Sequence, residues 1–177
     1  DLQIPDFDQM AFRYTVVEFN TAVKPFLLEY LFSKYQLRSL CYFDPDIYFY
    51  RPITPIFDLL EHNSVVLTPH LLAPIEDSHL PDEPYILRAG VYNLGFIGLA
   101  QGPDLERLLR WWQRRLLKDC VVDIARGLFV DQRWIDLIPG FFDRVAILRE
   151  PGFNVAYWNL NHRTVHQRDG ELLVNGK

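Results

Sequence analysis

The sequence predicts an α/β domain in which helices flank a sheet. Helix and strand patterns alternate along the chain, which is typical of layered α/β domains rather than of all-α or all-β ones. The chain has 177 residues, the length of one ordinary domain, so we expect a single domain over 1–177. Hydrophobic residues make up 49% and charged residues 23%, and this balance argues against disordered, collagen-like and coiled-coil chains.

The expected helices combine start signals with apolar stripes at helical spacing. Thr21 is a plausible N-cap, and Pro25 lies in the first turn of the same helix, where its missing N–H costs nothing. Acidic residues open the helix that begins at Asp104 and basic residues close it, as the helix dipole favours. The helices are expected over 21–35, 54–61 and 104–118, and a short one begins near Asp131.

Short apolar runs bounded by turn residues predict the strands. They are expected over 40–43, 64–67, 92–100 and 144–148, followed by a hairpin that pairs 164–167 with 172–174. The segment 69–84 is rich in proline and predicts a long functional loop. Asn175-Gly176 is a strong signal for a hairpin turn at the end of the chain.

Composition limits the compartment and the partners. A net charge of −5 disfavours nucleic-acid binding through a basic field. No apolar run reaches the roughly 20 residues of a transmembrane helix, and the first residues do not resemble a signal peptide. Cys41 and Cys120 both lie in apolar surroundings, so we expect buried free thiols in a reducing compartment, the cytoplasm.

Asp44-Pro45-Asp46 ends the expected strand over 40–43, and this position indicates a metal site. Ligands bind beyond the carboxyl ends of strands in α/β sheets. Two carboxylates on one bend supply oxygen ligands to Mg²⁺ or Mn²⁺, which would neutralise a leaving diphosphate. The segment 6–8 has the same D-x-D spacing without a preceding strand. The alternative that Asp44 and Asp46 only end a strand and cap a turn therefore stays open.

Four motifs follow one another between the first expected helix and the last strand. They are Leu-Cys-Tyr-Phe-Asp-Pro-Asp-Ile at 40–47, Tyr-Asn-Leu-Gly-Phe-Ile at 92–97, Asp-Gln at 131–132 and Phe-Asn-Val at 153–155. Together they resemble the motifs of GT-A glycosyltransferases, the enzymes that use nucleotide-sugars. Their order is similar to that of the retaining, glycogenin-like group called glycosyltransferase family 8. The resemblance covers about residues 21 to 155.

The resemblance implies the GT-A fold, a mixed sheet flanked by helices. It also implies transfer of a sugar from a nucleotide-diphosphate-sugar, a UDP-sugar above all, to a hydroxyl of a saccharide or other acceptor. Mn²⁺ or Mg²⁺ would be held by Asp44 and Asp46, and the anomeric configuration would be retained. Attack from the same face as the departing diphosphate would need no protein nucleophile, and no side chain here is a convincing one.

The remaining site residues are likewise implied by the resemblance. Asn93 would hydrogen-bond the donor sugar, and Gly95 would keep the strand close to it. Asp131 would bind sugar hydroxyls and Gln132 would lie beneath the anomeric carbon, as the catalytic pair. Lys24 and Asn154 complete the expected substrate-binding set, in which Lys24 would steady the first aspartate or the donor.

Each of these residues also has a structural alternative. Asn93 could satisfy a backbone group at the start of a strand, and Asp131 could be only an N-cap. A solvated side chain is the favoured interpretation of Lys24. His70 and His79 are expected to be solvated loop residues, whereas Tyr157-Trp158 is a candidate for acceptor contact. Trp112 is expected in the core, on the apolar face of its helix.

Two departures from the family pattern predict a partial domain, cut at both ends. The family begins with a strand and a loop that bind the nucleotide base, and nothing upstream of Asp44 resembles them. Its third metal ligand is a histidine in an H-x-x-G segment, whereas His162 and His166 have no glycine three residues later. The sheet is therefore expected to be incomplete at the N-terminal side.

Two further function classes stay open. One is a metal-dependent nucleotidyltransferase that uses the same carboxylates. The other is a non-catalytic carbohydrate-binding or interaction domain derived from this fold. A truncated sheet would also expose an edge on which a homo-oligomer could form.

Overall fold

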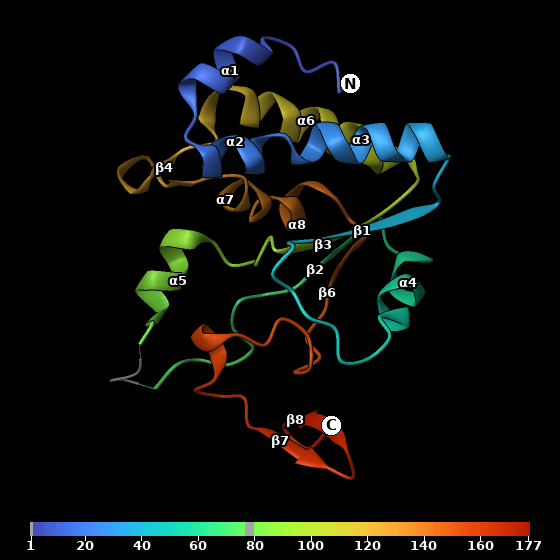
Figure 1. Ribbon diagram of the computed structural model, residues 1–177, viewed down its shortest axis with the longest axis vertical. Helices are drawn as coiled ribbons and strands as arrows, with labels where there is room; N and C mark the ends of the chain where they lie inside the picture. Colours follow the sequence, from blue (N-terminus) through green and yellow to red (C-terminus); the bar gives the residue numbers. More distant parts are fainter. Residues whose placement is uncertain (1, 77–79) are drawn as a thin grey trace.

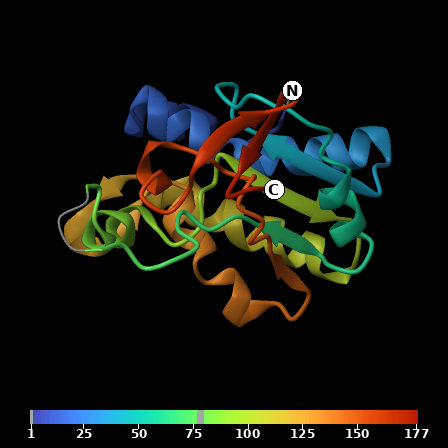
Figure 2. The same ribbon diagram turned by 90° about the horizontal axis from the view of Figure 1, so that it is seen from below.

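The computed structural model describes residues 2–76 and 80–177, and these form a mixed sheet flanked by helices (Figure 1). The four strands of the sheet are ordered β1-β3-β2-β6 and lie side by side in Figure 2. Their bounds are Ser39–Phe43 for β1, Val65–Leu67 for β2, Phe96–Ala100 for β3 and Val145–Ile147 for β6. β3 is antiparallel to both β1 and β2, and β2 is parallel to β6. The expected α/β class and mixed sheet are thus confirmed.

Helices cover both faces of this sheet. The helices are α1 Phe7–Arg13, α2 Val16–Ala22, α3 Lys24–Tyr35, α4 Thr54–Leu60, α5 Glu83–Ala89, α6 Pro103–Asp119, α7 Gln132–Ile135 and α8 Ile138–Phe141, with short 3₁₀ turns η1 Ile124–Arg126 and η2 Tyr157–Asn159. Figure 1 shows α3 and α6 on one side of the sheet and α4 on the other. Two small ribbons complete the fold: β4 Val122–Asp123 with β5 Leu128–Phe129, and the hairpin of β7 Val165–Arg168 with β8 Glu171–Val174.

The two-residue periodicity of the strands explains the two-sided burial. Ile97 and Leu99 of β3 point toward α3 and α6 and belong to the larger core cluster. Phe96 and Ala100 point the other way and pack with Ile56 of α4. Strands buried on both faces read as continuous apolar runs, which is why β3 was recognisable in the sequence.

The expected helix over 21–35 is wrong at its start. The chain forms two helices there, α2 and α3, which meet at Val23. Thr15, not Thr21, is the cap. The Thr15 side chain accepts from the Glu18 backbone N–H, and the Glu18 carboxylate accepts from the Thr15 backbone N–H. Thr21 Oγ donates instead to carbonyls one turn earlier in α2. Pro25 does lie in the first turn of α3.

The expected loop over 69–84 and strand over 92–100 were both too long. α5 begins at Glu83, after a cap in which Asp82 accepts from the Tyr85 backbone N–H. The regular strand begins only at Phe96, because residues 91–95 form a bend that carries site residues. His79 lies outside the described residues.

The C-terminal hairpin is confirmed, and so is its last turn. Asn175 and Gly176 have φ of 53° and 82°, the left-handed backbone that this dipeptide favours. Val174 and Lys177 exchange two backbone hydrogen bonds of 2.9 and 3.2 Å across them. The turn therefore forms as the sequence indicated.

Both thiols are free, as expected, but only one of them is buried. Cys41 and Cys120 form no disulfide; Cys120 is buried and Cys41 is half-buried. Burial raises the pKa of both, that of Cys41 to about 11 and that of Cys120 to about 12. Within residues 2–76 and 80–177, no helix is long and apolar enough to cross a membrane.

Trp112 and its neighbours on α6 form the apolar centre of the larger cluster, as expected. We predict that Leu108→Ala, which empties a fully buried position of α6, lowers the free energy of unfolding by about 2–5 kcal/mol in urea titration. Leu87→Ala is the matched control: Leu87 is 58% exposed on α5, and its loss should cost about 0.5 kcal/mol or less. Equal costs for the two variants would contradict this core.

Candidate functional site

The site is built at the carboxyl end of β1. The Asp44 backbone N–H donates to the Gly95 carbonyl at 2.8 Å, which extends the β1–β3 ladder by one residue. The Ile47 N–H then donates to the Asp44 carbonyl at 3.2 Å and closes a four-residue turn with Pro45 in its second position. This turn places Asp46 on the exposed side and leaves the Asp44 side chain 37% exposed.

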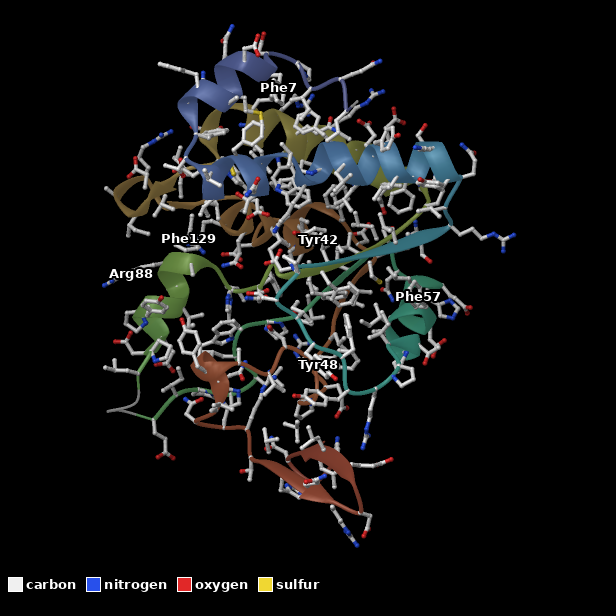
Figure 3. All side chains as sticks on the ribbon, viewed as in Figure 1. Phe7, Tyr42, Tyr48, Phe57, Arg88 and Phe129 are labelled. Carbon is white, nitrogen blue, oxygen red and sulfur yellow. The ribbon has the colours of Figure 1, made fainter. Side chains whose placement is uncertain are left out.

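Tyr42 holds the Asp44 carboxylate in place. Its hydroxyl donates to Asp44 Oδ1 at 2.6 Å, and Figure 3 shows Tyr42 on β1, beneath α3. Burial and the neighbouring Asp44 raise the pKa of Tyr42, so the phenol stays protonated and remains a donor. Tyr42 was not among the expected site residues, although its place two residues before Asp44 puts both side chains on one face of the strand.

Lys24 is buried, so the solvated interpretation of this lysine is wrong. Its ammonium lies 3.0 Å from Asp131 Oδ2 and 3.5 Å from Asp44 Oδ1, and it donates to the Leu94 carbonyl at 3.1 Å. The same ammonium stands 4.7 Å above the centre of the Tyr42 ring. These four partners replace water around the charge, which allows a lysine to be only 5% exposed at the start of α3.

Asp131 occupies the N-cap position of α7, but its side chain is a buried carboxylate that does not cap the helix. It precedes α7 but makes no capping hydrogen bond, and it is 2% exposed. Burial raises the pKa of Asp131 to about 6, and the Lys24 ammonium offsets part of that rise. The capping alternative is therefore wrong, and Asp131 and Asp44 share one cation.

Gln132 supports the bend before β3. Its Oε1 accepts from the Leu94 N–H at 2.8 Å, and its Nε2 donates to the Ala89 carbonyl at 2.9 Å. The side chain is buried, so it fastens residues 89–94 to α7. The catalytic role expected of Gln132 stays a prediction.

Asn93 satisfies a backbone group, as its structural alternative proposed. Its Oδ1 accepts from the Gly95 N–H at 3.0 Å, and its Nδ2 lies 3.2 Å from His70 Nε2. A side chain at Gly95 would meet these groups at once: a Cβ there would lie 2.8 Å from Asn93 Oδ1 and 3.3 Å from Asp44 Oδ2. Gly95 is thus required where β1, Asn93 and the turn converge.

His70 links this centre to Asn154. His70 is 5% exposed, not solvated as expected, and burial lowers the pKa of its imidazole. The Asn159 side chain donates to the carbonyls of both His70 and Asn154, while Asn154 Nδ2 donates to the Pro69 carbonyl at 3.1 Å. Asn154 therefore lies at the edge of the site, where its side chain contacts the backbone of Pro69 and its carbonyl contacts Asn159. Asn159 carried no signal in the sequence.

Tyr157 and Trp158 differ in their surroundings. Trp158 is half-buried and packs edge-on against His70 at 5.6 Å, whereas Tyr157 is 65% exposed. Contact of Tyr157 with an acceptor stays a prediction.

The residues brought together come from distant parts of the chain. They are Lys24, Asp44, Asn93, Gly95, Asp131 and Gln132, with Tyr42 and His70 added by the structure. Six of these eight were expected as site residues. Asp46 lies at the rim and Asn154 behind His70.

The free carboxylate oxygens at the rim suit a hard divalent cation. In the described part of the chain, neither Asp44 Oδ2 nor the Asp46 carboxylate accepts a hydrogen bond or an ion pair. Mg²⁺ commonly takes one or two protein carboxylates and completes its shell with water and phosphate oxygens. Among residues 2–76 and 80–177, no group of three or more His, Cys, Asp or Glu side chains is gathered around one point.

Comparison with known proteins finds relatives in Bacillus subtilis (strain 168). The chain is 31% identical over 159 residues to the uncharacterized protein YfnF, covering 89% of this chain and 52% of YfnF. It is 26% identical over 178 residues to the uncharacterized protein YfnD, covering 99% of this chain and 55% of YfnD. The chain thus spans about half the length of these curated relatives. No protein-family profile and no solved structure matches it.

The buried Asp131 predicts a specific pH dependence. Its pKa is about 6 in the folded chain against an ordinary 3.8, so folding takes up a proton between these values and stability falls as the pH rises through them. The asparagine in Asp131→Asn does not titrate. Measured relative to that variant, the free energy of unfolding of the wild type should therefore fall by about 3 kcal/mol as the pH rises through this window. Urea titrations of both proteins at a series of pH values measure this, and a constant difference would contradict it.

The close approach at Gly95 predicts that Gly95→Ala costs about 1–3 kcal/mol of unfolding free energy, because its Cβ displaces Asn93. Gly152→Ala is the control, since nothing lies within 4 Å of a Cβ there. In an Asn93→Ala background, Gly95→Ala should cost less, because the atom that the Cβ meets has gone. An unchanged cost in that background would show that Asn93 is not the obstacle.

Proposed function

We propose that this chain is the central part of a GT-A glycosyltransferase similar to family 8, which moves a sugar from a nucleotide-diphosphate-sugar to an acceptor hydroxyl. The observation that carries the proposal is the Lys24 ammonium between Asp44 and Asp131. Three segments that the resemblance assigned to one site meet at this ammonium. A cytoplasmic location, a UDP-sugar donor and the retaining outcome belong to the same proposal.

The residues of the site would have separate roles, which follow from their positions. Asp44 and Asp46 present free oxygens at the rim, where a bound Mn²⁺ or Mg²⁺ would neutralise charge on the leaving diphosphate. Tyr42 and Lys24 hold Asp44 in one orientation, so little reorganisation is needed when the donor binds. Gly95 lets Asn93 Oδ1 and Asp44 Oδ2 approach the backbone closely, and this would set both side chains beside the donor sugar.

Asp131 would complete the sugar site from the buried side. Lys24 offsets its charge, so the buried Asp131 carboxylate would act through Lys24 and hold that ammonium, and with it Asp44, in place beside the sugar. The diphosphate would take the acceptor proton as the new glycosidic bond forms on the face from which it leaves. Gln132 would act through the bend at Leu94 that it holds.

One observation favours a second candidate function. Both ends of the Asn93 amide and both ends of the Gln132 amide already contact protein groups. A non-catalytic carbohydrate-binding or interaction domain would retain such an arrangement as structure alone.

Melting temperature with Mn²⁺ and UDP tests the proposal. With UDP about a hundredfold above its Kd, the wild type should melt about 5–10 °C higher than without ligand. Asp46→Asn should abolish the rise while melting normally alone. Asp44→Asn should also abolish it, from a lower starting melting temperature, because it removes a negative partner of the buried Lys24 ammonium. Asp8→Asn, the same change in the D-x-D at 6–8, is the matched control and should keep the rise.

The outcomes separate the candidate functions. An unchanged melting temperature of the wild type contradicts the transferase and favours the non-catalytic domain. A larger rise with Mn²⁺ and UTP than with Mn²⁺ and UDP-glucose favours a nucleotidyltransferase. An equal loss in Asp8→Asn would show that the effect is only one of net charge.

A further inference from the structure

Two tyrosines project from the loop that follows the D-x-D turn. This aromatic loop, residues 47–50 with the sequence Ile-Tyr-Phe-Tyr, joins β1 to α4. Tyr48 is 76% exposed and Tyr50 is 70% exposed, and their ring centres lie 4.7 Å apart with the planes tilted by 57°. Exposed aromatic rings that lie together form a candidate binding surface, because tyrosine and tryptophan are enriched where proteins bind partners.

Contacts with the sheet anchor the aromatic loop and leave the two tyrosines exposed to solvent. The Phe49 ring meets the Phe43 ring of β1 edge-on, with centres 4.7 Å apart. The Ile47 side chain packs over Gly95, where its Cδ1 would lie 3.6 Å from a Cβ. Alternate residues of the loop are therefore anchored on the sheet, and Tyr48 and Tyr50 face away from it.

An open pocket of about 420 Å³ lies beside Tyr50, between the aromatic loop and the β7–β8 hairpin. It is lined by Tyr50, Arg51, Gln167, Gly170, Glu171 and Leu172. Arg51 Nη2 and Glu171 Oε2 form an ion pair of 2.7 Å across it, so their charges cancel. The lining thus offers hydrogen-bond donors and acceptors beside an aromatic ring, without net charge. That chemistry suits a neutral, polyhydroxylated ligand of small-molecule size.

The aromatic loop is within reach of the transfer site. Tyr48 is four positions beyond Asp44, so their α-carbons are at most about 14 Å apart, and for Tyr50 the limit is about 22 Å. Figure 3 shows Tyr48 on the side of the sheet away from α3 and α6, toward the hairpin. A saccharide chain of a few rings spans this interval.

We infer that Tyr48 and Tyr50 form a stacking subsite for a neutral oligosaccharide, with Arg51, Gln167 and Glu171 as its hydrogen-bonding wall. Sugar rings present patches of C–H groups that pack on aromatic faces, while their hydroxyls bond to the polar wall. The binding surface stands on the loop and the pocket alone. Its role as the acceptor subsite rests on the proposed glycosyltransferase function.

Saturation-transfer NMR on the 177-residue chain tests this inference. The probes are maltohexaose, cellohexaose and chitohexaose, with hexagalacturonate as an anionic counterpart, each at millimolar concentration. Irradiation of the aromatic protons should transfer saturation to the ring C–H protons of at least one neutral probe. Tyr48→Ala and Tyr50→Ala should each weaken binding about two- to tenfold, the value of one lost aromatic contact.

The control is Tyr35→Ala, which removes a tyrosine that is 58% exposed at the end of α3. It should leave saturation transfer unchanged. Since all three tyrosines are largely exposed, the variants should keep the circular dichroism spectrum of the wild type. No transfer to any neutral probe, or equal loss in Tyr35→Ala, would overturn the inference. Preferred binding of hexagalacturonate would also overturn it. The same holds if Tyr48→Ala loses self-association while its sugar binding is unchanged.

Failure of this inference can be told apart from failure of the proposed function. Tyr48→Ala and Tyr50→Ala should keep the rise in melting temperature with Mn²⁺ and UDP, because they do not touch Asp44. If sugar binding is found but the nucleotide effect is not, the stacking subsite stands and the transferase fails. If the reverse is found, the donor site stands and the stacking subsite is wrong.

Discussion

The site depends on the ion pairs and the hydrogen bond of the Lys24 ammonium group. This ammonium stands between Asp44 and Asp131 and contacts the Leu94 carbonyl, so it ties together the start of α3, the end of β1, the bend before β3 and the start of α7. Two carboxylates and one cation make a cluster with a net negative charge beside the rim at Asp46. Removing one partner of such a buried group leaves an unpaired charge, which is far costlier than losing a surface ion pair. A cation ligand at the rim would add the missing positive charge, and the proposed function uses this imbalance.

Much of the architecture was predictable because it is local. Apolar runs identified the strands, and the acidic start and basic end of the segment 104–118 identified α6. The motif order also collected Asp44, Asn93, Gly95, Asp131 and Gln132, which the fold brings together. These positions could be found because each motif lies where a strand or helix begins or ends. Whether they bind a nucleotide-sugar stays a proposal, since the curated relatives YfnF and YfnD are themselves uncharacterized.

The parts that could not be predicted depend on partners far away in the chain. Lys24 looked solvated because its neighbours in sequence give no hint of Asp131, which lies more than a hundred positions later. His70 looked like a loop histidine, yet it is enclosed by Asn93, Trp158 and Asn159. Thr21 was a plausible cap by type, but the capping box at Thr15 begins the helix earlier. For Lys24 and His70 a tertiary contact decided between options that local propensity left equal, whereas the capping box of Thr15 and Glu18 is a local signal.

The carboxyl end of β1 is the proposed meeting place of metal and nucleotide. Paramagnetic broadening in an amide ¹H–¹⁵N spectrum locates that place directly, because Mn²⁺ removes the signals of nearby residues. With Mn²⁺ and UDP, the amide signals of Asp44, Asp46 and Gly95 should disappear, while those of Phe7 and Asp8 at the other D-x-D should remain. Signals that persist at Asp44 and Gly95, or loss centred on Asp8, would contradict the proposed site.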